Sequence, residues 1–353
     1  MPTSALSSVL TGLLTTSLVA VPTPLAWQPS PVPDGNAVLY TTEQAQGEQW
    51  AVGIELEQQD GGPAVAFHPL AWRHDATGWH PTKSVVPDGR LDDLLVRGRN
   101  DAWAVGATDD VDSVGIVQHW TGKAWKKVAT PATTGSGFTA ISPVGKQLLV
   151  GQYNSAESST AVLRSTANGW KVLPSDGLQN VVYIDDLVAL PGGQILAAGI
   201  GGMSTYDGTA WKPVKLPLPT DRVSEIAHLL VRSATDIWAV GEKPSDEYWR
   251  QPLALHYDGK TWTEVPAPVR TGQFHDVDLV DGKLVAVGGD PNTGEPLVAE
   301  YDGTKFVTAT TPPGAGYLHG SSSTGKQLTT VGVALQSGLE LPYVAVGKHK
   351  PVN

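Results

Sequence analysis

Short apolar runs that end at a glycine recur along the chain at nearly regular intervals. Two of these runs, residues 101–106 and 236–241, differ only at their second position. The glycines that end the runs lie at seven places: Gly53, Gly106, Gly151, Gly199, Gly241, Gly288 and Gly332. A short apolar run bounded by turn residues is typical of a buried β-strand. The pattern therefore predicts seven copies of one strand-containing unit, each about 46 residues long.

Each unit contains three further segments with the pattern of strands. One ends at a tight Asp-Gly turn, as in residues 256–262 and 301–306, and Asp-Gly is a strong hairpin signal. An aromatic residue then opens an outer strand that ends at a proline six residues later, in four units: Trp125 and Pro131, Trp211 and Pro217, Trp262 and Pro268, Phe306 and Pro312. Proline is tolerated at the exposed edge of a sheet. With an innermost strand such as residues 184–188, the units predict an all-β fold, a seven-bladed β-propeller of four-stranded antiparallel blades.

The last unit lacks its outer strand, and the missing strand is found at the other end of the chain. After Gly332 the sequence offers one more strand, residues 342–346, and then ends. Residues 27–33 carry the same aromatic-to-proline spacing of six. We therefore expect the N-terminal segment to close the ring as the outer strand of the last blade, which removes exposed strand edges. A single propeller domain over residues 25–353 is predicted; six blades with ragged ends, or two domains, are the alternatives.

Composition supports short strands and excludes several functions. The 353 residues include 39 glycines and 27 prolines, which disfavours a helical bundle. Because cysteine is absent, disulfides, thiolate metal sites and cysteine nucleophiles are excluded. The net charge of −11, without any basic run, gives no electrostatic footprint for nucleic acid or anionic lipid. We expect a monomer.

Residues 1–24 form an apolar leader that predicts export. Residues 5–21 are uncharged and mostly apolar or hydroxylated, with the length of a signal-peptide core. A secreted, periplasmic or cell-surface protein with no membrane span in its mature domain is therefore expected. No lysine or arginine precedes the leader, and a cytoplasmic protein with an amphipathic leader is the alternative.

The repeats resemble those of a known group of propellers. A strand ending in Val287-Gly288-Gly289, followed by Tyr301-Asp302 and an aromatic residue, is similar to kelch and galactose-oxidase-like propellers. The Trp-Ala-Val-Gly form of the other repeats resembles bacterial exported repeat proteins. The resemblance implies the fold alone, because propellers include enzymes, lectins and scaffolds. The copper-radical site of such oxidases is not implied, since its cysteine is absent.

Standard catalytic motifs are missing from the sequence. It contains no glycine-rich phosphate loop, no His-Glu-x-x-His and no Gly-x-Ser-x-Gly. The turn at residues 258–262 is similar to the Asp-box of sialidases, but lacks one residue between the aspartate and the glycine. Since this turn recurs in several units, it is interpreted as a structural turn.

Candidate chemistry comes from the innermost strand, which lines the central channel. Counting back 13 residues from the marker glycine selects Tyr40, Asp93, Asp186, His228 and His319. In the sixth unit Asp278 is assigned to this row after allowing for a shorter turn, with His275 and Asp276 close by. In the third unit Ala140 takes the place. Carboxylates and imidazoles in one channel could hold a divalent cation or transfer protons; no other cofactor is indicated. They could equally face water or bind backbone groups in turns.

Two functions follow, from different classes. In the first, the protein binds a carbohydrate, a peptide, a protein surface or a small molecule through the face that carries the loops between second and third strands. Tyr248, Trp249 and Arg250 lie in such a loop and are residue types of binding hot spots, with Tyr40 as a further ligand-binding candidate.

In the second, it is a lyase, isomerase or hydrolase. His228, His275 or His319 would act as the general base, and Asp93, Asp186 and Asp278 would orient it or hold a metal. Convergence of the histidines in one pocket would favour the enzyme.

Overall fold

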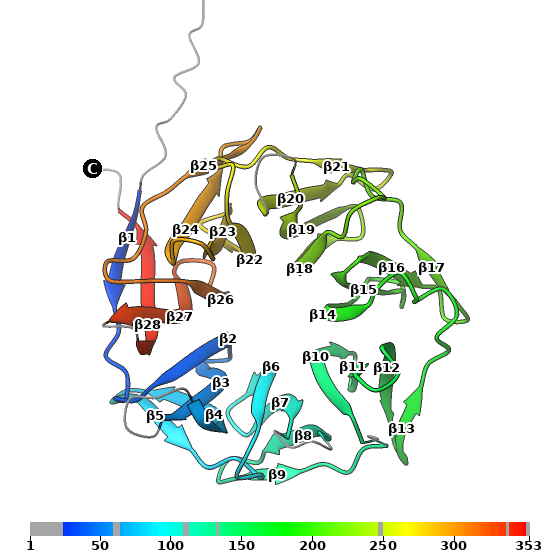
Figure 1. The fold of residues 1–353 in the computed structure, drawn as a ribbon, viewed down its shortest axis with the longest axis horizontal. Helices are drawn as coiled ribbons and strands as arrows, with labels where there is room; N and C mark the ends of the chain where they lie inside the picture. The colour runs from blue at the N-terminus through cyan, green and yellow to red at the C-terminus, as the bar shows by residue number, and fades with distance from the viewer. Residues whose placement is uncertain are drawn as a thin grey trace, which may run out of the picture.

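The chain folds into a ring of seven four-stranded blades around a central axis (Figure 1). The computed structural model describes residues 24–58, 64–108, 113–131, 134–245, 250–336 and 339–350. In each of the first six blades the chain runs outward through four antiparallel strands, and the seventh blade takes its outer strand from the N-terminal end of the chain. We number the blades 1 to 7 from residue 37 onward. The described part of the chain has no helix long and apolar enough to span a membrane. The predicted propeller is confirmed.

The four strands of each blade occupy equivalent places. The inner strands are β2 (Ala37–Ala45), β6 (Arg90–Gly98), β10 (Ser136–Val144), β14 (Tyr183–Ala189), β18 (Glu225–Ser233), β22 (Gln273–Val280) and β26 (Leu318–Ser323). The second strands are β3 (Glu48–Gln58), β7 (Asp101–Ala107), β11 (Gln147–Asn154), β15 (Ile195–Ile200), β19 (Asp236–Lys243), β23 (Lys283–Asp290) and β27 (Leu328–Gln336). The third strands are β4 (Ala64–Asp75), β8 (Gly115–Trp120), β12 (Ser159–Thr166), β16 (Gly202–Tyr206), β20 (Gln251–Tyr257), β24 (Glu295–Tyr301) and β28 (Leu339–His349). The outer strands are β5 (Gly78–Thr82), β9 (Trp125–Lys127), β13 (Gly169–Val172), β17 (Trp211–Pro213), β21 (Trp262–Glu264), β25 (Phe306–Thr308) and β1 (Leu25–Pro29).

A bulge in the inner strand explains the repeated glycines. In blade 2 the pairing of β6 with β7 shifts between Leu91 and Asp93, directly after the pair Leu91–Gly106. A Cβ atom on Gly106 would lie only 2.0 Å from the carbonyl oxygen of Arg90. The marker glycines of five other blades face a carbonyl oxygen of the inner strand at 1.9 to 2.1 Å in the same way: Gly53, Gly199, Gly241, Gly288 and Gly332. Any side chain at these positions would force the bulged strand away.

The Asp-x-Trp-Ala-Val-Gly motif is a structural triad. In blade 2, Trp103 stacks on His119 with ring centroids 3.9 Å apart. The indole Nε1–H of Trp103 and Nε2 of His119 both hydrogen-bond to Oδ1 of Asp101, at 2.6 and 2.9 Å. Blade 5 repeats the arrangement with Asp236, Trp238 and His256. The motif therefore ties the second strand to the third.

The Asp-Gly turns are structural as predicted. Oδ1 of Asp258 accepts the backbone N–H groups of Lys260 and Thr261, and Oδ1 of Asp302 accepts those of Thr304 and Lys305. Aspartate commonly stabilises turns in this way.

The ring is closed by β1 and β28, which come from opposite ends of the chain. They pair antiparallel, with Trp27 opposite Gly347, and Figure 1 shows the blue β1 beside the red β28. The indole of Trp27 donates to the carbonyl of Thr310 in blade 6 at 2.7 Å, and the Thr310 hydroxyl donates to the carbonyl of Leu25 at 2.6 Å. The predicted closure is confirmed, although the paired strand begins two residues before Trp27.

Removing β1 should destabilise the whole ring. A variant lacking residues 1–33 loses the buried Leu25 and exposes the edge of β28, whereas a variant lacking residues 1–23 keeps β1. We expect a loss of about 4 kcal/mol for the first variant, which corresponds to a fall of about 5 °C in Tm for a chain of this length. Thermal unfolding followed by circular dichroism measures the difference; equal Tm values would contradict the closure.

Candidate functional site

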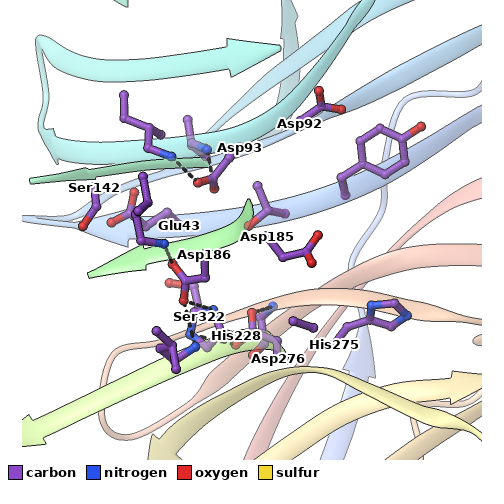
Figure 2. A pocket seen from close by; sticks show the side chains of 18 of the residues that line it. Glu43, Asp92, Asp93, Ser142, Asp185, Asp186, His228, His275, Asp276 and Ser322 are labelled. Carbon is purple, nitrogen blue, oxygen red and sulfur yellow. Dashed lines mark hydrogen bonds and ion pairs between the residues drawn. The ribbon is translucent and has the colours of Figure 1, made fainter. Parts of the chain in front are cut away.

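A cavity on the axis of the ring is lined by all seven inner strands and has a volume of about 570 Å³. Eight carboxyl side chains lie on its wall, and no lysine or arginine is among the described residues that line it. The acids are Glu43, Asp92, Asp93, Asp185, Asp186, Glu225, Asp276 and Asp278. Figure 2 shows six of them together with His228 and His275. The cavity therefore attracts cations and repels anions.

The bulge of the inner strand creates two rows of side chains around the cavity. The bulged row consists of the unpaired residue of each strand: Tyr40, Asp92, Thr139, Asp185, Ala227, His275 and His319. The deep row consists of the residue after it: Thr41, Asp93, Ala140, Asp186, His228, Asp276 and Gly320. The bulged row lies nearer the end where the inner strands begin, which we call the mouth.

The predicted row mixed these two sets, and one assignment was wrong. Tyr40 and His319 belong to the bulged row, whereas Asp93, Asp186 and His228 belong to the deep row. In blade 6 the residue equivalent to Asp93 is Asp276, not Asp278. The bulge of β22 lies between Phe274 and Asp276, and Asp278 is two residues further along the strand, opposite Val285.

The aspartates of the deep row connect neighbouring blades. Oδ2 of Asp93 in blade 2 accepts the backbone N–H of Ile141 in blade 3 at 2.7 Å, and its Oδ1 accepts the N–H of Leu94 at 2.7 Å. Asp186 in blade 4 likewise accepts the N–H of Leu229 in blade 5 and the N–H of Leu187 in its own strand. Asp276 in blade 6 accepts the N–H of Ser321 in blade 7. These aspartates act as clamps, which satisfies backbone donors on the cavity wall.

Blade 1 is connected to its two neighbouring blades by other side chains. Glu43 accepts the backbone N–H of Val96 in blade 2. Gln44 donates from Nε2 to the carbonyl of Ser322 in blade 7 at 2.8 Å, while its own N–H bonds to the Ser322 hydroxyl at 3.0 Å.

His228 replaces the aspartate in blade 5 and lies between two clamps. Its Nδ1 is 3.4 Å from Oδ2 of Asp186, and its Nε2 is 3.4 Å from Oδ1 of Asp276. Burial lowers the pKa of His228, but the carboxylates of Asp276 and Asp186 more than offset this effect, so its pKa is raised. With 35% of its side-chain surface exposed, His228 faces the cavity, and the two carboxylates favour its protonated form.

His275 and His319 form a separate cluster in the bulged row. Their ring centroids are 5.4 Å apart, and both rings contact Tyr317. Burial lowers the pKa of His275 to about 3 and that of His319 to about 4, so both are neutral at pH 7. His228 instead contacts Asp186 and Asp276. The three predicted histidines are thus divided between two rows.

Arg250 is tied to the same side of the mouth. It forms an ion pair with Glu242 and donates to Oε1 of Gln273 at 3.1 Å. The amide nitrogen of Gln273 in turn lies 2.6 Å from Nε2 of His275, which accepts because the ring is neutral. Tyr248 and Trp249, the other predicted members of this loop, lie outside the described residues.

Burial raises the pKa of several wall carboxyls. It is raised to about 8 for Glu43, to about 7 for Asp93, and to about 6 for Asp92 and Asp278. Burial also raises the pKa of Asp185, with the negative charge of Glu225 adding to the effect. The cavity therefore holds protons near neutral pH. Among the described residues, no three His, Asp or Glu side chains are placed to hold a metal ion.

The geometry of ring, blades and cavity permits comparison with known proteins. The fold is that of known β-propellers. The chain is similar to YCF48 from Cyanidioschyzon merolae, with a TM-score of 0.58 and 16% identity over 92% of this chain and 99% of that one. It is also similar to the extracellular domain of a hybrid two component system from B. thetaiotaomicron, with a TM-score of 0.56 and 11% identity over 93% of this chain and 42% of that one. At such identities the likeness shows the fold alone. The sequence matches no protein-family model and no curated protein, so the kelch resemblance stays a prediction.

Sequence reasoning missed Asp92 and Asp185 and placed Asp276 only beside the predicted row, although a signal for all three was present. Residues 91–94 and 184–187 share an apolar–Asp–Asp–Leu pattern, and residues 274–277 replace the first aspartate with His275. Aligning these doublets would have separated the bulged row from the deep row.

Replacing a clamp should destabilise the protein more than replacing a turn aspartate. Asp186→Ala leaves two backbone N–H groups on the cavity wall without acceptors and removes a partner of His228, so we expect a loss of about 3 kcal/mol. Asp302→Ala also removes two backbone hydrogen bonds, but in an exposed turn where water replaces them, and should cost less than about 1 kcal/mol. Urea unfolding measures both; equal losses would show that the clamp does not hold the blades.

The raised pKa values predict that stability falls as the pH rises from about 6.5 to about 8.5. In this window the folded protein keeps protons on Glu43, Asp93 and His228 that the unfolded chain releases. Below about pH 6.5 the opposite effect of His275 and His319 appears, because only the unfolded chain protonates them. Glu43→Gln keeps an acceptor for Val96 and should flatten the slope between pH 6.5 and 8.5 by up to one proton. Tm measured at constant ionic strength tests this; an unchanged slope would contradict the raised pKa of Glu43.

Proposed function

We propose that this propeller is a non-catalytic binding protein that takes a lysine or arginine side chain of a peptide or protein partner into its mouth. The observation that carries the proposal is the cavity wall, with eight carboxyl groups and no lysine or arginine among its described members. Within this acidic cavity, the two rows of side chains differ in what they offer to a ligand.

The deep row has little free binding capacity. Asp93 and Asp186 each use both carboxylate oxygens for backbone N–H groups. Asp276 uses one oxygen for Ser321 and the other for His228. A ligand would have to compete with these contacts, which favours a structural role for this row.

The bulged row supplies two carboxyl oxygens that lack partners, although the other oxygen of Asp92 already accepts a hydrogen bond from Nε of Arg90 at 2.7 Å. Oδ2 of Asp92 and Oδ2 of Asp185 are buried and have no hydrogen-bond partner among the described residues. A buried acceptor without a donor is costly, and the N–H groups of a guanidinium or ammonium would satisfy it. In Figure 2, Asp92, Asp185 and His275 lie toward one end of the cavity, and Glu43, Ser142 and Ser322 toward the other. The unpaired acceptors are therefore those nearest the mouth.

Aromatic rings on the same part of the wall suit a cation. Tyr40, Tyr183, His275 and His319 all line the cavity, and cations bind well against aromatic faces. Arginine combines this stacking with planar, bidentate hydrogen bonding. A neutral carbohydrate or small molecule would use the rings but not the unpaired carboxylate oxygens.

An enzyme is the second candidate, and the observation that favours it is His228. This imidazole is accessible and held by two carboxylates, as an orienting arrangement for a proton donor would require. The alternatives differ in their dependence on it: Asp92 and Asp185 carry the binding proposal, whereas a lyase, isomerase or hydrolase would depend on His228. Because the carboxylates of Asp276 and Asp186 raise the pKa of His228 and favour its protonated form, the enzyme would use it as a general acid.

We also propose that the protein is exported and that its repeats are related to kelch repeats. We propose that the protein is secreted, periplasmic or displayed at the cell surface; mass spectrometry of its N-terminus, purified from cells and from medium, tests this. The apolar leader of the sequence supports export, and the double glycine at Gly288 and Gly289 supports a kelch-like ancestry.

The binding proposal predicts a preference for a charged side chain. A fluorescein-labelled Gly-Ser-Arg-Ser-Gly peptide should bind at least tenfold more tightly than the same peptide with citrulline, which has the same shape without the charge. The double variant Asp92→Asn/Asp185→Asn should lose about tenfold in affinity for the arginine peptide, measured by fluorescence anisotropy. Affinity should also rise from pH 6 to pH 8, because the pKa of Asp92 is raised to about 6 and its carboxyl group becomes fully ionised over this range.

The matched control is Asp258→Asn/Asp302→Asn, which changes the charge equally in exposed turns where asparagine also fits. It should bind as the unmodified protein does, and so should His228→Gln. Equal binding of the arginine and citrulline peptides, or full affinity in Asp92→Asn/Asp185→Asn, would refute the proposal.

A further inference from the structure

A second cavity of about 570 Å³ lies between blades 4 and 5. It is formed near the turns that join inner to second strands and third to outer strands, so it opens away from the mouth. Its apolar wall includes Leu190, Val214, Leu216, Ile237, Tyr257 and Trp262. We call it the rim groove. A volume of this size is typical of sites for small molecules and short peptide segments.

The groove lies where a repeated contact between blades is missing. In blades 3 and 7 the tryptophan of the outer strand donates its indole N–H to a carbonyl of the preceding blade: Trp170 to Ala129 at 3.0 Å, and Trp27 to Thr310 at 2.7 Å. The equivalent pair between blades 4 and 5 would be Trp262 and the carbonyl of Lys215. No such bond is present within the described chain, and Trp262 remains half-buried.

Backbone groups next to Trp262 are also available. The N–H of Val214 bonds to the carbonyl of Met203, but Lys215 and Leu216 make no backbone hydrogen bond in the part of the chain that the structure describes. The groove therefore combines an indole donor, backbone groups without backbone partners and an apolar floor. A peptide can use all three, because its own backbone can hydrogen-bond to these backbone groups.

The charges of the groove are the reverse of those of the cavity. Lys215 and Lys260 line it, and no aspartate or glutamate is among its described lining residues. Neither lysine forms an ion pair with a described acid, in a chain whose net charge is −11. Two unpaired ammonium groups beside an indole N–H attract a carboxylate.

We infer that the rim groove binds an extended peptide segment of a partner protein in which carboxylate side chains alternate with aliphatic ones. The aliphatic side chains pack on Leu216 and Trp262, the carboxylates pair with Lys215 and Lys260, and the peptide backbone bonds to residues 215–216. This site is independent of the mouth, because it lies on other strands and takes the opposite charge.

A labelled hexapeptide of alternating leucine and glutamate serves as the probe, with fluorescence anisotropy as the readout on the full chain. Lys260→Glu and Lys215→Glu should each weaken its binding about fivefold, and Trp262→Phe, which keeps the ring but removes the N–H, about threefold. Lys123 occupies the same turn position in blade 2 as Lys260 in blade 5, so Lys123→Glu is the matched control and should leave the affinity unchanged. Asp92→Asn/Asp185→Asn should also bind this peptide normally.

Several outcomes would overturn the inference. These are equal binding of a hexapeptide with lysine in place of glutamate, equal losses in Lys123→Glu and Lys260→Glu, and no binding at millimolar peptide. Circular dichroism of each variant confirms that the fold is retained. A peptide with serine in place of leucine should bind at least tenfold more weakly; if it binds equally, the apolar wall has no role and the inference fails.

Discussion

The close approach of the inner strand to the second strand is the constraint on which the rest of the propeller depends. At six blades a carbonyl oxygen of the inner strand lies where the side chain of the paired residue would begin. Glycine alone fits there, and the extra residue of the bulge is what brings the carbonyl so close. Blade 3 is the exception. Gly151 pairs with Ala140 after the bulge, and a Cβ atom on it would meet a side-chain atom of Ile184 rather than a carbonyl oxygen.

The bulge also divides the acidic residues of the cavity by function. Successive side chains of a regular strand point to opposite faces, but in five of the seven blades the bulged residue and the one after it both line the cavity. The deep row uses its oxygens to connect blades across the cavity wall, so its acids act in stability. The bulged row keeps oxygens of Asp92 and Asp185 unpaired, which makes that row the part of the wall from which binding is expected. The deep row therefore stabilises the ring, and the bulged row makes the mouth of the cavity acidic.

Much of the fold could be predicted from sequence, because its determinants are local. The marker glycines, the Asp-Gly turns and the spacing from Trp27 to Pro33 reflect steric rules that act over a few residues. The rows of the cavity could be predicted only in part. Blades 2 and 5 contain a second bulge near the turn, at Val96/Gly98 and Val231/Ser233. In these two blades the second bulge adds one residue between the bulged-row residue and the marker glycine. A fixed count of 13 residues back from the glycine therefore selected Asp93 and His228 from the deep row, but Tyr40 and His319 from the bulged row. His228 contacts Asp186 and Asp276, which belong to the blades on either side of its own. No local sequence pattern specifies distances between strands of different blades.

The dependence of the bulge on glycine is tested most directly by the free energy of unfolding of Gly106→Ala, measured in urea beside Gly35→Ala. A methyl group at residue 106 would meet the Arg90 carbonyl at 2.0 Å, whereas nothing lies within 4 Å of one at residue 35. We predict a loss of about 3 kcal/mol or more for Gly106→Ala and less than about 0.5 kcal/mol for Gly35→Ala. Equal stability of the two variants would show that the bulged strand does not require its glycine.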